Sequence, residues 1–321
     1  MHPFRISWGR GRVQSASTAG DLIFQSFSTI VALSVIGLLV LIVAILFVAA
    51  EASIRTFGVG FLTGSVWNPT AGVFGAAPFV YGMLVTSAVA LLLGVPISMG
   101  IAIFLSELAP PWLRIPLTYV VELLAAVPSV IYGLWGIFVL GPVMRAQVEP
   151  AIQSVLGFLP LFQGNAIGRD VFTAGVILAV MIIPTISAVS REALVAVPTS
   201  QREASLSIGA TGWETTRLAV LRYARAGIFG AVILGLGRAV GETMAVTMTI
   251  GNRNAISGSL FGQGQTIASL IANSWLEAIA GSLELSALIE LGLVLMLVSL
   301  LINTFARLMV GRVLRIGEGE E

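Results

Sequence analysis

The sequence of 321 residues contains no cysteine and no lysine, and its single histidine is His2. Without cysteine the chain cannot form disulfides, use a thiol nucleophile or build a cysteine-based metal site. With one histidine at the N-terminus, we also expect no histidine catalysis and no metal site. Because all 17 basic residues are arginines, the chain lacks the lysine of the G-x-x-x-x-G-K-[ST] loop that binds nucleotide phosphates. If ATP drives this protein, a different polypeptide must bind the nucleotide.

Charged residues are also scarce. They make up 10% of the chain, whereas hydrophobic residues make up 57%; soluble domains carry about 25% charged residues. This composition predicts an integral membrane protein. The net charge of +1 and the spread of the arginines over short segments give no basic patch, so no nucleic-acid partner is expected.

Long apolar stretches predict an all-α protein with six transmembrane helices. About 20 apolar residues in a helix cross a hydrocarbon layer of about 30 Å. The six stretches cover residues 29–50, 79–105, 115–140, 171–189, 226–250 and 285–308. They lie in a membrane domain of residues 28–311, between tails of residues 1–27 and 312–321. The segment 141–170 is predicted to be external, because its apolar piece, residues 152–161, is too short to span.

The distribution of arginine predicts the orientation. Twelve arginines lie in or next to the two tails, in the turn 106–114 and in the segment 190–225, whereas four lie in segments on the opposite side. Cytoplasmic loops carry the excess of basic residues in membrane proteins. Both termini are therefore predicted to be cytoplasmic.

The fifth predicted helix carries two charges, Arg238 and Glu242, inside an otherwise apolar run. Each charge costs roughly 2.5–3.5 kcal/mol at the centre of a membrane helix. In a continuous helix, residues four apart lie on one face and one turn from each other. Gly235, Gly237 and Gly241 keep the nearby surface small, which allows another helix or a ligand to approach closely.

Two interpretations of this pair are open from the residues alone. In the first, the pair lines an anion path: Arg238 offers a planar set of donors suited to the oxygens of an oxyanion, and Glu242 accepts a hydrogen bond from a protonated oxygen of that anion. An oxyanion without such a proton, as sulfate is at neutral pH, would be rejected by a buried acceptor. Thr243 adds a hydroxyl to this path. In the second, the two charges form an ion pair that neutralises them or docks the helix on a partner.

The third predicted helix contributes two further candidates, Glu122 and Ser129. Glu122 has no partner within its own helix, so it pairs with Arg238, pairs with an arginine of another subunit, or is hydrated near the cytoplasmic surface. The step from Pro128 to Ser129 frees a backbone carbonyl, which either lines a cavity or belongs to a simple kink.

The segment 190–225 is predicted to form two short helices with a bend at Gly209. Pro198 and the hydroxyl residues after it are typical of a helix start. The apolar side chains of the segment suit either an amphipathic connector or a surface helix that docks in the groove of another protein.

Within this segment, Glu203-Ala-Ser-Leu-Ser-Ile-Gly209, followed twelve residues later by Leu221, resembles the EAA loop of ABC-importer permeases. In that family the loop forms coupling helices that sit in a cleft of the ATPase subunit. The chain departs from the family pattern at Ser205, Ala219 and Arg222, of which the last replaces a proline and leaves the end of the second short helix open. The residues that the resemblance assigns to ATPase coupling are Glu203, Ala204, Ser205, Gly209 and Leu221.

Two longer stretches, residues 122–136 and 237–246, closely resemble the PstC type of phosphate-specific ABC permease. The resemblance covers about residues 20–315. It implies the fold of a type I ABC-importer permease in a bacterial inner membrane, and transport of inorganic phosphate without covalent chemistry in this chain. The residues that it assigns to substrate translocation are Arg238, Glu242, Thr243, Glu122 and Ser129.

The same resemblance implies the partners. They are a homologous PstA-like permease, two PstB-like ATPase subunits and an external PstS-like phosphate-binding protein. No cofactor is expected on this chain, since ATP and magnesium belong to the ATPase. The alternatives are a permease for another oxyanion such as sulfate or molybdate, an ion-coupled secondary anion transporter, and a structural or sensory membrane protein. The long segment 190–225 disfavours a secondary transporter, which has no ATPase to dock.

Overall fold

The computed structural model describes residues 19–318. Within that range the chain consists of helices and loops, without a β-strand. Six helical segments are long and apolar enough to cross a membrane, which confirms the prediction of an all-α protein with six spans. These segments are Gly20–Ala49, Ala77–Leu108, Ser129–Leu156, Val171–Val195, Gly212–Gly241 and Leu283–Leu308. Most of the predicted N-terminal tail, and the last three residues of the predicted C-terminal tail, lie outside the described range.

Helix α1 (Ala19–Ala49) belongs to a structural unit of its own. It carries one charge, Asp21 in its first turn, and none over the rest of its length. An uncharged helix of this length is typical of a membrane span.

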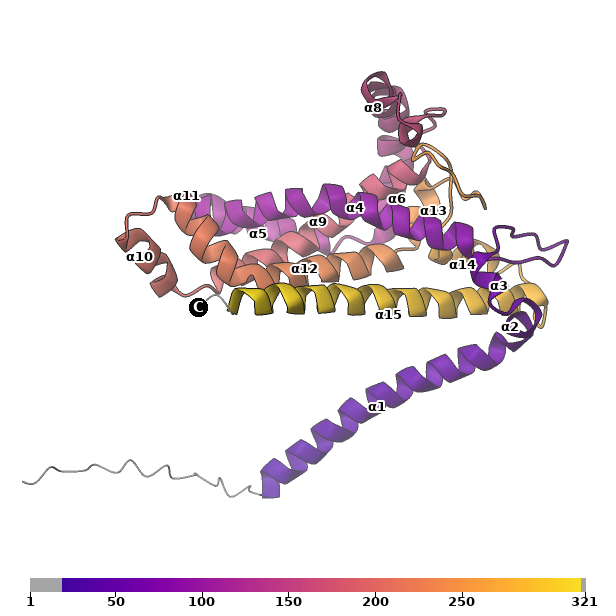
Figure 1. Ribbon diagram of the computed structural model, residues 1–321, viewed down its shortest axis with the longest axis horizontal. Helices are drawn as coiled ribbons and strands as arrows, with labels where there is room; N and C mark the ends of the chain where they lie inside the picture. Colours follow the sequence, from indigo (N-terminus) through magenta and orange to yellow (C-terminus); the bar gives the residue numbers. More distant parts are fainter. Residues whose placement is uncertain (1–18, 319–321) are drawn as a thin grey trace, which may run out of the picture. The chain divides into compact units, whose positions relative to one another are not determined.

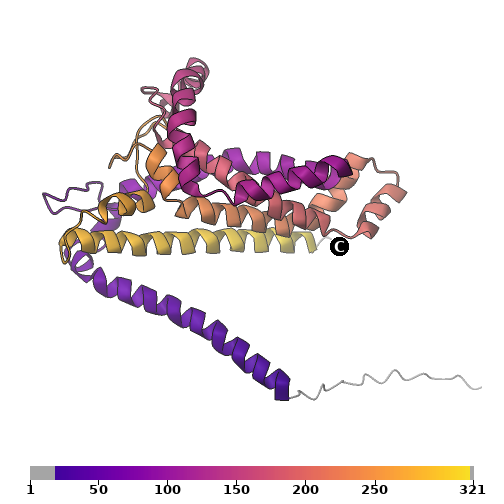
Figure 2. The ribbon, with the colours of Figure 1, turned by 180° about the vertical axis from the view of Figure 1, so that it is seen from behind.

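The second unit is built around four long helices that run side by side (Figures 1 and 2). They are α4 (Ala77–Ile103), α9 (Val171–Val195), α12 (Leu221–Gly241) and α15 (Leu283–Glu318). Helix α9 is central, since it packs against both α4 and α12 and 67% of its most apolar stretch is buried. Glycine permits this close packing: a Cβ on Gly175 of α9 would lie 2.5 Å from Cγ1 of Val89 in α4. The fourth span therefore holds the second unit together.

One end of the second unit has an aromatic core. The short helices there are α2 (Glu51–Phe57), α3 (Gly60–Thr63) and α14 (Ile267–Ser274). The buried ring of Trp67 packs edge-on against Phe74 and Phe79, with ring centroids 4.8 and 5.4 Å away. The N–H of Ser53 donates to Oγ of Ser286 at 3.1 Å and ties α2 to α15. These contacts fix the loops at this end onto the spans.

The third predicted span, 115–140, is interrupted at Pro128. Proline has no N–H to continue a helix, and it disfavours the helical backbone conformation of the residue before it. Helix α5 therefore ends at Ala125, and α6 begins at Ser129. From there the chain stays helical to Leu156, so the helical run continues past the predicted limit of 140 into the first half of the segment 141–170. The pieces are α5 (Pro111–Ala125), α6 (Ser129–Trp135), η2 (Gly136–Leu140), α7 (Gly141–Val143), η3 (Met144–Val148) and α8 (Glu149–Leu156). The run from α6 to α8 turns aside from the direction of α5 and α9 (Figure 1).

The opposite end of the second unit carries the segment that was predicted to dock another protein (Figure 1). It folds as α10 (Thr199–Ser207) and α11 (Gly212–Thr215) with a bend at Gly209, as predicted. The second short helix does not end, because α11, η5 (Thr216–Val220) and α12 form one helical segment. Arg222, unlike the proline of the family pattern, keeps its N–H and lets the helix continue. The fifth helix therefore runs from Gly212 to Gly241, and its ends differ from the predicted limits 226 and 250.

Candidate functional site

The fifth span ends between the two charges that the sequence singles out. Helix α12 stops at Gly241, Glu242 is extended with φ −71° and ψ 130°, and α13 (Met244–Thr249) starts two residues later. The prediction that Arg238 and Glu242 share one face of a continuous helix is therefore wrong, and no ion pair joins them within the described range. The cause is local. Glu242 Oε1 accepts a hydrogen bond from the N–H of Ala245 at 3.4 Å, so the carboxylate satisfies a free donor in the first turn of α13.

Polar groups line the break between α12 and α13. Thr243 lies inside it, half-buried, and its hydroxyl is 3.5 Å from the carbonyl oxygen of Gly241. The hydroxyl of Thr247 donates to the carbonyl of Thr243 at 2.7 Å. Non-helical backbone at membrane depth is tolerated where it is covered by protein or lines a water-filled cavity. The break is thus a polar feature within an apolar part of the chain.

Arg238 lies in a pocket of about 870 Å³ between α9, α12 and α15. Its Nη1 donates to Oγ1 of Thr185 in α9 at 3.0 Å. The other polar side chains of the pocket are Asn303, Thr304 and Arg307 of α15, and no described carboxylate lines it. Two guanidinium groups in a space without a counter-charge make the pocket strongly cationic.

The polar residues of α15 were missed in the sequence analysis. Asn303, Thr304 and Arg307 lie near the end of the sixth span, where an arginine resembles the basic residues that commonly flank a span. Together with Leu300 they follow the i, i+3, i+4, i+7 spacing of one helix face. A polar stripe with this spacing inside an apolar span is the sequence signal that could have identified them.

Glu122 and Ser129 do not line this pocket. Glu122 of α5 pairs with Arg191 of α9, with Oε1 3.6 Å from Nη2, and its side chain is 50% exposed. Of the partners considered for Glu122, Arg238 is therefore not the one in this structure. Ser129 is the first residue of α6 and is half-buried beside Pro128.

The three glycines around Arg238 face different surroundings. A Cβ on buried Gly235 would lie 2.5 Å from Cδ1 of Ile186 in α9, so this glycine allows α12 and α9 to touch. Gly237 lines the pocket, and a Cβ there would lie 3.9 Å from Oδ1 of Asn303 in α15. A Cβ on Gly241 would meet no atom within 4 Å. The predicted close helix approach thus occurs at Gly235, whereas Gly237 leaves room in the pocket.

Replacement of Gly235 by alanine should loosen the packing of α12 on α9. The added methyl group would overlap the fully buried side chain of Ile186, and overpacking of this kind costs about 1–3 kcal/mol. We expect the midpoint of thermal unfolding in detergent to fall by several degrees. Gly237→Ala is the matched control, because its methyl group has room. Equal midpoints for the two variants would contradict the role given to Gly235.

A Schellman turn sets the bend between α10 and α11. The N–H of Gly209 donates to the carbonyl of Leu206 at 3.0 Å, and the N–H of Ala210 donates to the carbonyl of Ser205 at 3.3 Å. Gly209 has φ +92°, a conformation that favours glycine. The hydroxyl of Thr215 donates to Oγ of Ser205 at 3.2 Å. The serine that replaces the alanine of the family pattern therefore ties the two short helices together.

The surface of this bend is apolar. Leu206, Ile208 and Trp213 are 52%, 86% and 59% exposed. Glu203 and Ala204 are exposed on the same helix as Leu206. A cluster of exposed apolar side chains with a polar neighbour is typical of a surface that another protein covers.

Contacts within the chain connect the bend to the spans. Arg202 of α10 forms an ion pair with Glu107 of η1 (Phe104–Leu108), and its Nη2 donates to the carbonyl of Leu194 in α9 at 2.9 Å. Leu221 is half-buried and packs against a buried cluster that includes Leu194. A displacement of α10 would therefore act on the ends of the second and fourth spans.

Two carboxyl groups are buried together beside the start of α9. Glu149 and Asp170 are both 0% exposed. Asp170 Oδ1 accepts from the N–H of Thr173 at 2.8 Å, and Glu149 Oε1 accepts from the Thr173 hydroxyl at 3.4 Å. Burial, together with the neighbouring Glu149 carboxyl, raises the pKa of Asp170 to about 7. Arg145 and Arg169 are exposed, and neither forms an ion pair with these carboxyls in the part of the chain that is described.

The raised pKa of Asp170 predicts that the protein becomes less stable as the pH rises from about 4 to about 7. Over this range the folded state holds a proton that the unfolded state, with its ordinary pKa of 3.8, has released. The stabilisation is complete below pH 4 and is lost as the pH passes 7. Asp170→Asn keeps an acceptor for the N–H of Thr173 but cannot ionise, so its unfolding midpoint should vary less with pH. The exposed Glu277→Gln is the control, and equal pH dependence in both variants would contradict the assignment.

The chain matches a known family over most of its length. The model of the family described as binding-protein-dependent transport system inner membrane component matches residues 94–315. The chain is 45% identical over 297 residues to the phosphate transport system permease protein PstC of Mesorhizobium japonicum, covering 91% of this chain and 90% of that protein. It is 43% identical over 294 residues to PstC of Haemophilus influenzae, and the match covers 90% of this chain and 93% of that protein. A probable PstC of Methanocaldococcus jannaschii is 35% identical over 271 residues, and the match covers 83% of this chain and 86% of that protein.

Solved structures confirm the fold. A crystal structure of a bacterial ABC transporter involved in the import of the acidic polysaccharide alginate matches with a TM-score of 0.60 at 16% identity, covering 91% of this chain and 98% of that one. An inward-facing MetNI methionine ABC transporter matches with a TM-score of 0.53 at 19% identity, and the match covers 73% of this chain and 93% of that one. At these identities the likeness concerns the fold alone, which is that of a type I ABC-importer permease.

Proposed function

Because the chain belongs to the family of binding-protein-dependent transport system inner membrane components, and within it to the PstC permeases, we propose that it forms one half of the membrane pathway of an ATP-driven phosphate importer. The observation that carries this proposal is the 43–45% identity to PstC proteins over about nine tenths of the chain. The chain is a transporter component of a bacterial-type membrane system rather than an enzyme. The cationic pocket around Arg238 supports an anion as the cargo.

Arg238 binds phosphate in this proposal. Thr185 accepts a hydrogen bond from Nη1 and so fixes the orientation of the guanidinium plane. The remaining N–H groups are available to the pocket, and the planar arrangement of guanidinium donors matches two oxygens of one phosphate. Hydrogen bonds between ionised groups are roughly twice as strong as those between neutral ones. The pocket therefore supplies an attractive step along the path.

Glu242 and Thr243 supply selectivity at the break between α12 and α13. No arginine in the described range pairs with Glu242, so its carboxylate can accept a hydrogen bond from a protonated phosphate oxygen. Sulfate has no proton to offer at neutral pH and would leave the carboxylate repelling it. Discontinuous helices commonly build substrate sites in membrane transporters. Glu122 and Ser129 contribute by holding the break between α5 and α6 in place, without touching the anion.

The bend between α10 and α11 docks the ATPase. Its exposed apolar side chains and Glu203, Ala204, Ser205, Gly209 and Leu221 form or support the docking surface. Since the chain has no lysine for a nucleotide-binding loop, two partner ATPase subunits bind ATP and magnesium. This end faces the cytoplasm, as do both termini, and a homologous PstA-like permease completes the path. A PstS-like phosphate-binding protein delivers the anion at the opposite end, and movement of the bend opens the path to each side in turn.

Transport by the reconstituted complex tests the proposal. The chain is placed with its partner permease, ATPase and binding protein in liposomes, and uptake of labelled phosphate is measured with and without ATP. We expect uptake that requires ATP and resists competition by sulfate and molybdate. Uptake that follows an imposed pH gradient and ignores ATP would favour an ion-coupled carrier. Faster ATP-driven uptake of sulfate or molybdate would assign the permease to another oxyanion.

A further inference from the structure

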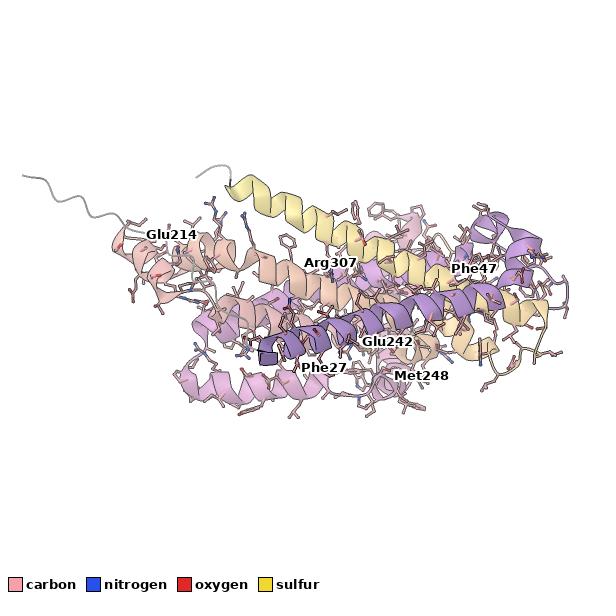
Figure 3. All side chains as sticks on the ribbon, turned by 90° about the horizontal axis from the view of Figure 1, so that it is seen from below. Phe27, Phe47, Glu214, Glu242, Met248 and Arg307 are labelled. Carbon is pink, nitrogen blue, oxygen red and sulfur yellow. The ribbon has the colours of Figure 1, made fainter. Side chains whose placement is uncertain are left out.

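The pocket around Arg238 contains a second arginine whose role the proposed function does not explain. Arg307 of α15 lines the pocket together with Arg238 of α12, although the two residues are far apart in the sequence. Figure 3 shows Arg307 on the side of α15 that faces the other spans. Within the described range Arg307 has no hydrogen bond or ion pair, and the only bond of the Arg238 side chain is the one to Thr185. Among the described residues, the second charge of the pocket is thus unpaired.

The two arginines lie at different levels of the pocket. Helices α12 and α15 run in opposite directions, since α15 ends on the side where α12 begins (Figure 1). Asn303 of α15 is level with Gly237 of α12, because a Cβ on that glycine would lie 3.9 Å from Asn303 Oδ1. Arg307, one turn beyond Asn303, therefore lies closer than Arg238 to the end that carries α10 and α11. The pocket extends along α12 from Gly230 to Arg238, about 12 Å at 1.5 Å per residue.

The composition of the pocket favours an anion. Its walls include Ile233, Leu234 and Leu300, and the side chain of Arg307 is exposed, so an anion can reach the guanidinium groups from solvent. Two like charges in such a space repel each other, and a bound anion removes that cost. Thr304 and Asn303 offer further donors between the two arginines.

The volume indicates how the anion is held. One water molecule takes about 30 Å³ in the liquid, so a pocket of about 870 Å³ holds a phosphate with much of its hydration shell. A partly hydrated anion is bound weakly and can leave. These properties suit a position that the anion passes through rather than one that retains it.

We propose that Arg307 is a second phosphate-binding arginine, which takes the anion from Arg238 and stabilises it on the side of the pocket toward α10 and α11. The inference rests on the proposed phosphate import. It adds a passage in two steps: Arg238 binds the anion first, and Arg307 attracts it toward the ATPase side. The same phosphate chemistry is present in lipid headgroups, which the experiment below separates from free phosphate.

Substitution of Arg307 in the reconstituted complex tests the proposal. Arg307→Gln removes the charge but keeps hydrogen-bond donors, and we expect the maximal rate of ATP-driven phosphate uptake to fall about tenfold, the effect of losing one charged hydrogen bond. The phosphate concentration for half-maximal uptake should change little, since the external binding protein captures the anion. Arg307→Lys restores the charge and should recover part of the rate. Arg222→Gln is the matched control, because Arg222 is an exposed arginine of α12 outside the pocket.

The lipid composition identifies the source of the phosphate group. The uptake defect of Arg307→Gln should be equal in wholly zwitterionic liposomes and in liposomes with added anionic lipid. A defect that appears only with anionic lipid would assign Arg307 to a headgroup and overturn the proposal. Equal rates for Arg307→Gln and Arg222→Gln would also overturn it. If the wild-type complex shows no ATP-driven phosphate uptake, the proposed function itself fails.

Chemical protection of the wild-type complex provides a measurement that needs no variant. Phenylglyoxal modifies accessible arginines, and mass spectrometry reports the extent of modification at each one. In detergent, inorganic phosphate should slow the modification of Arg307 several-fold and leave that of Arg222 unchanged. Equal modification of Arg307 with and without phosphate would overturn the proposal even if Arg307→Gln fails to fold.

Discussion

Replacement of Arg238 by alanine should abolish ATP-driven phosphate uptake while the complex still assembles and hydrolyses ATP. The guanidinium group is oriented by Thr185 and lines the cationic pocket. Loss of two charged hydrogen bonds to phosphate, each contributing about 1.5–3 kcal/mol, slows the passage by at least about a hundredfold. Uptake of labelled phosphate by proteoliposomes measures the loss, and ATPase activity of the same preparation reports assembly.

Two further variants show which property of Arg238 matters. Arg238→Lys keeps the charge but loses the planar pair of donors, so uptake should fall to an intermediate level. Thr185→Val removes the acceptor that orients Nη1 and should slow uptake less than the loss of the arginine does. If Arg238→Ala transports normally, the arginine is only a charge that stabilises the packing of α12 on α9. In that case Thr185→Val should lower the unfolding midpoint without changing uptake.

The sequence was sufficient to predict the number of spans and two of the residues that line the pocket, Gly237 and Arg238. Length and apolar character identify a membrane helix because the thickness of the bilayer is fixed, and all six spans are present. Arg238 stands out because a charge in an apolar run is costly. The bend at Gly209 is also predictable, since glycine commonly follows the last residue of a helix.

The partners of Arg238 could not be predicted in the same way. Thr185 and Arg307 lie on two other spans, so their proximity depends on how α9, α12 and α15 pack. The sequence between Arg238 and Glu242 contains no proline, and the break after α12 is accompanied by a hydrogen bond from the N–H of Ala245 to the carboxylate of Glu242. The pattern of apolar residues is the same whether or not that bond forms. The limits of the third span were mispredicted for another reason. Pro128 is visible in the sequence as a helix breaker, but the helical run continues past Pro142, which lies between the π-helical segments η2 and η3.

Replacement of Gly209 by alanine should uncouple ATP hydrolysis from transport. Gly209 has φ +92°, and an L-residue with a side chain is disfavoured at positive φ by about 1–2 kcal/mol. A Cβ at this position would meet no atom within 4 Å, so the effect comes from the backbone and not from a clash. The two hydrogen bonds of the Schellman turn depend on that φ, and their loss changes the direction of α10 relative to α11. We expect phosphate uptake per ATP hydrolysed to fall roughly tenfold.

Two substitutions at this bend serve as controls. Gly212→Ala adds the same methyl group three residues away, where the backbone is helical and the added Cβ also meets no atom within 4 Å. It should transport as the wild type does. Gly209→Asn should be intermediate, because asparagine tolerates positive φ better than alanine. With respect to position 209, uptake is therefore expected to be highest with glycine, intermediate with asparagine and lowest with alanine.

The Gly209 and Arg238 variants fail in different ways, and this difference separates coupling from substrate passage. In Gly209→Ala the pocket is intact, so ATP hydrolysis should lose its stimulation by the phosphate-loaded binding protein, because α10 no longer relays movement through Arg202 to Glu107 and Leu194. In Arg238→Ala the bend is intact, so that stimulation should persist without uptake. If Gly209→Ala keeps both stimulation and uptake, the bend has no role in coupling, and α10 and α11 are an ordinary connector between the fourth and fifth spans.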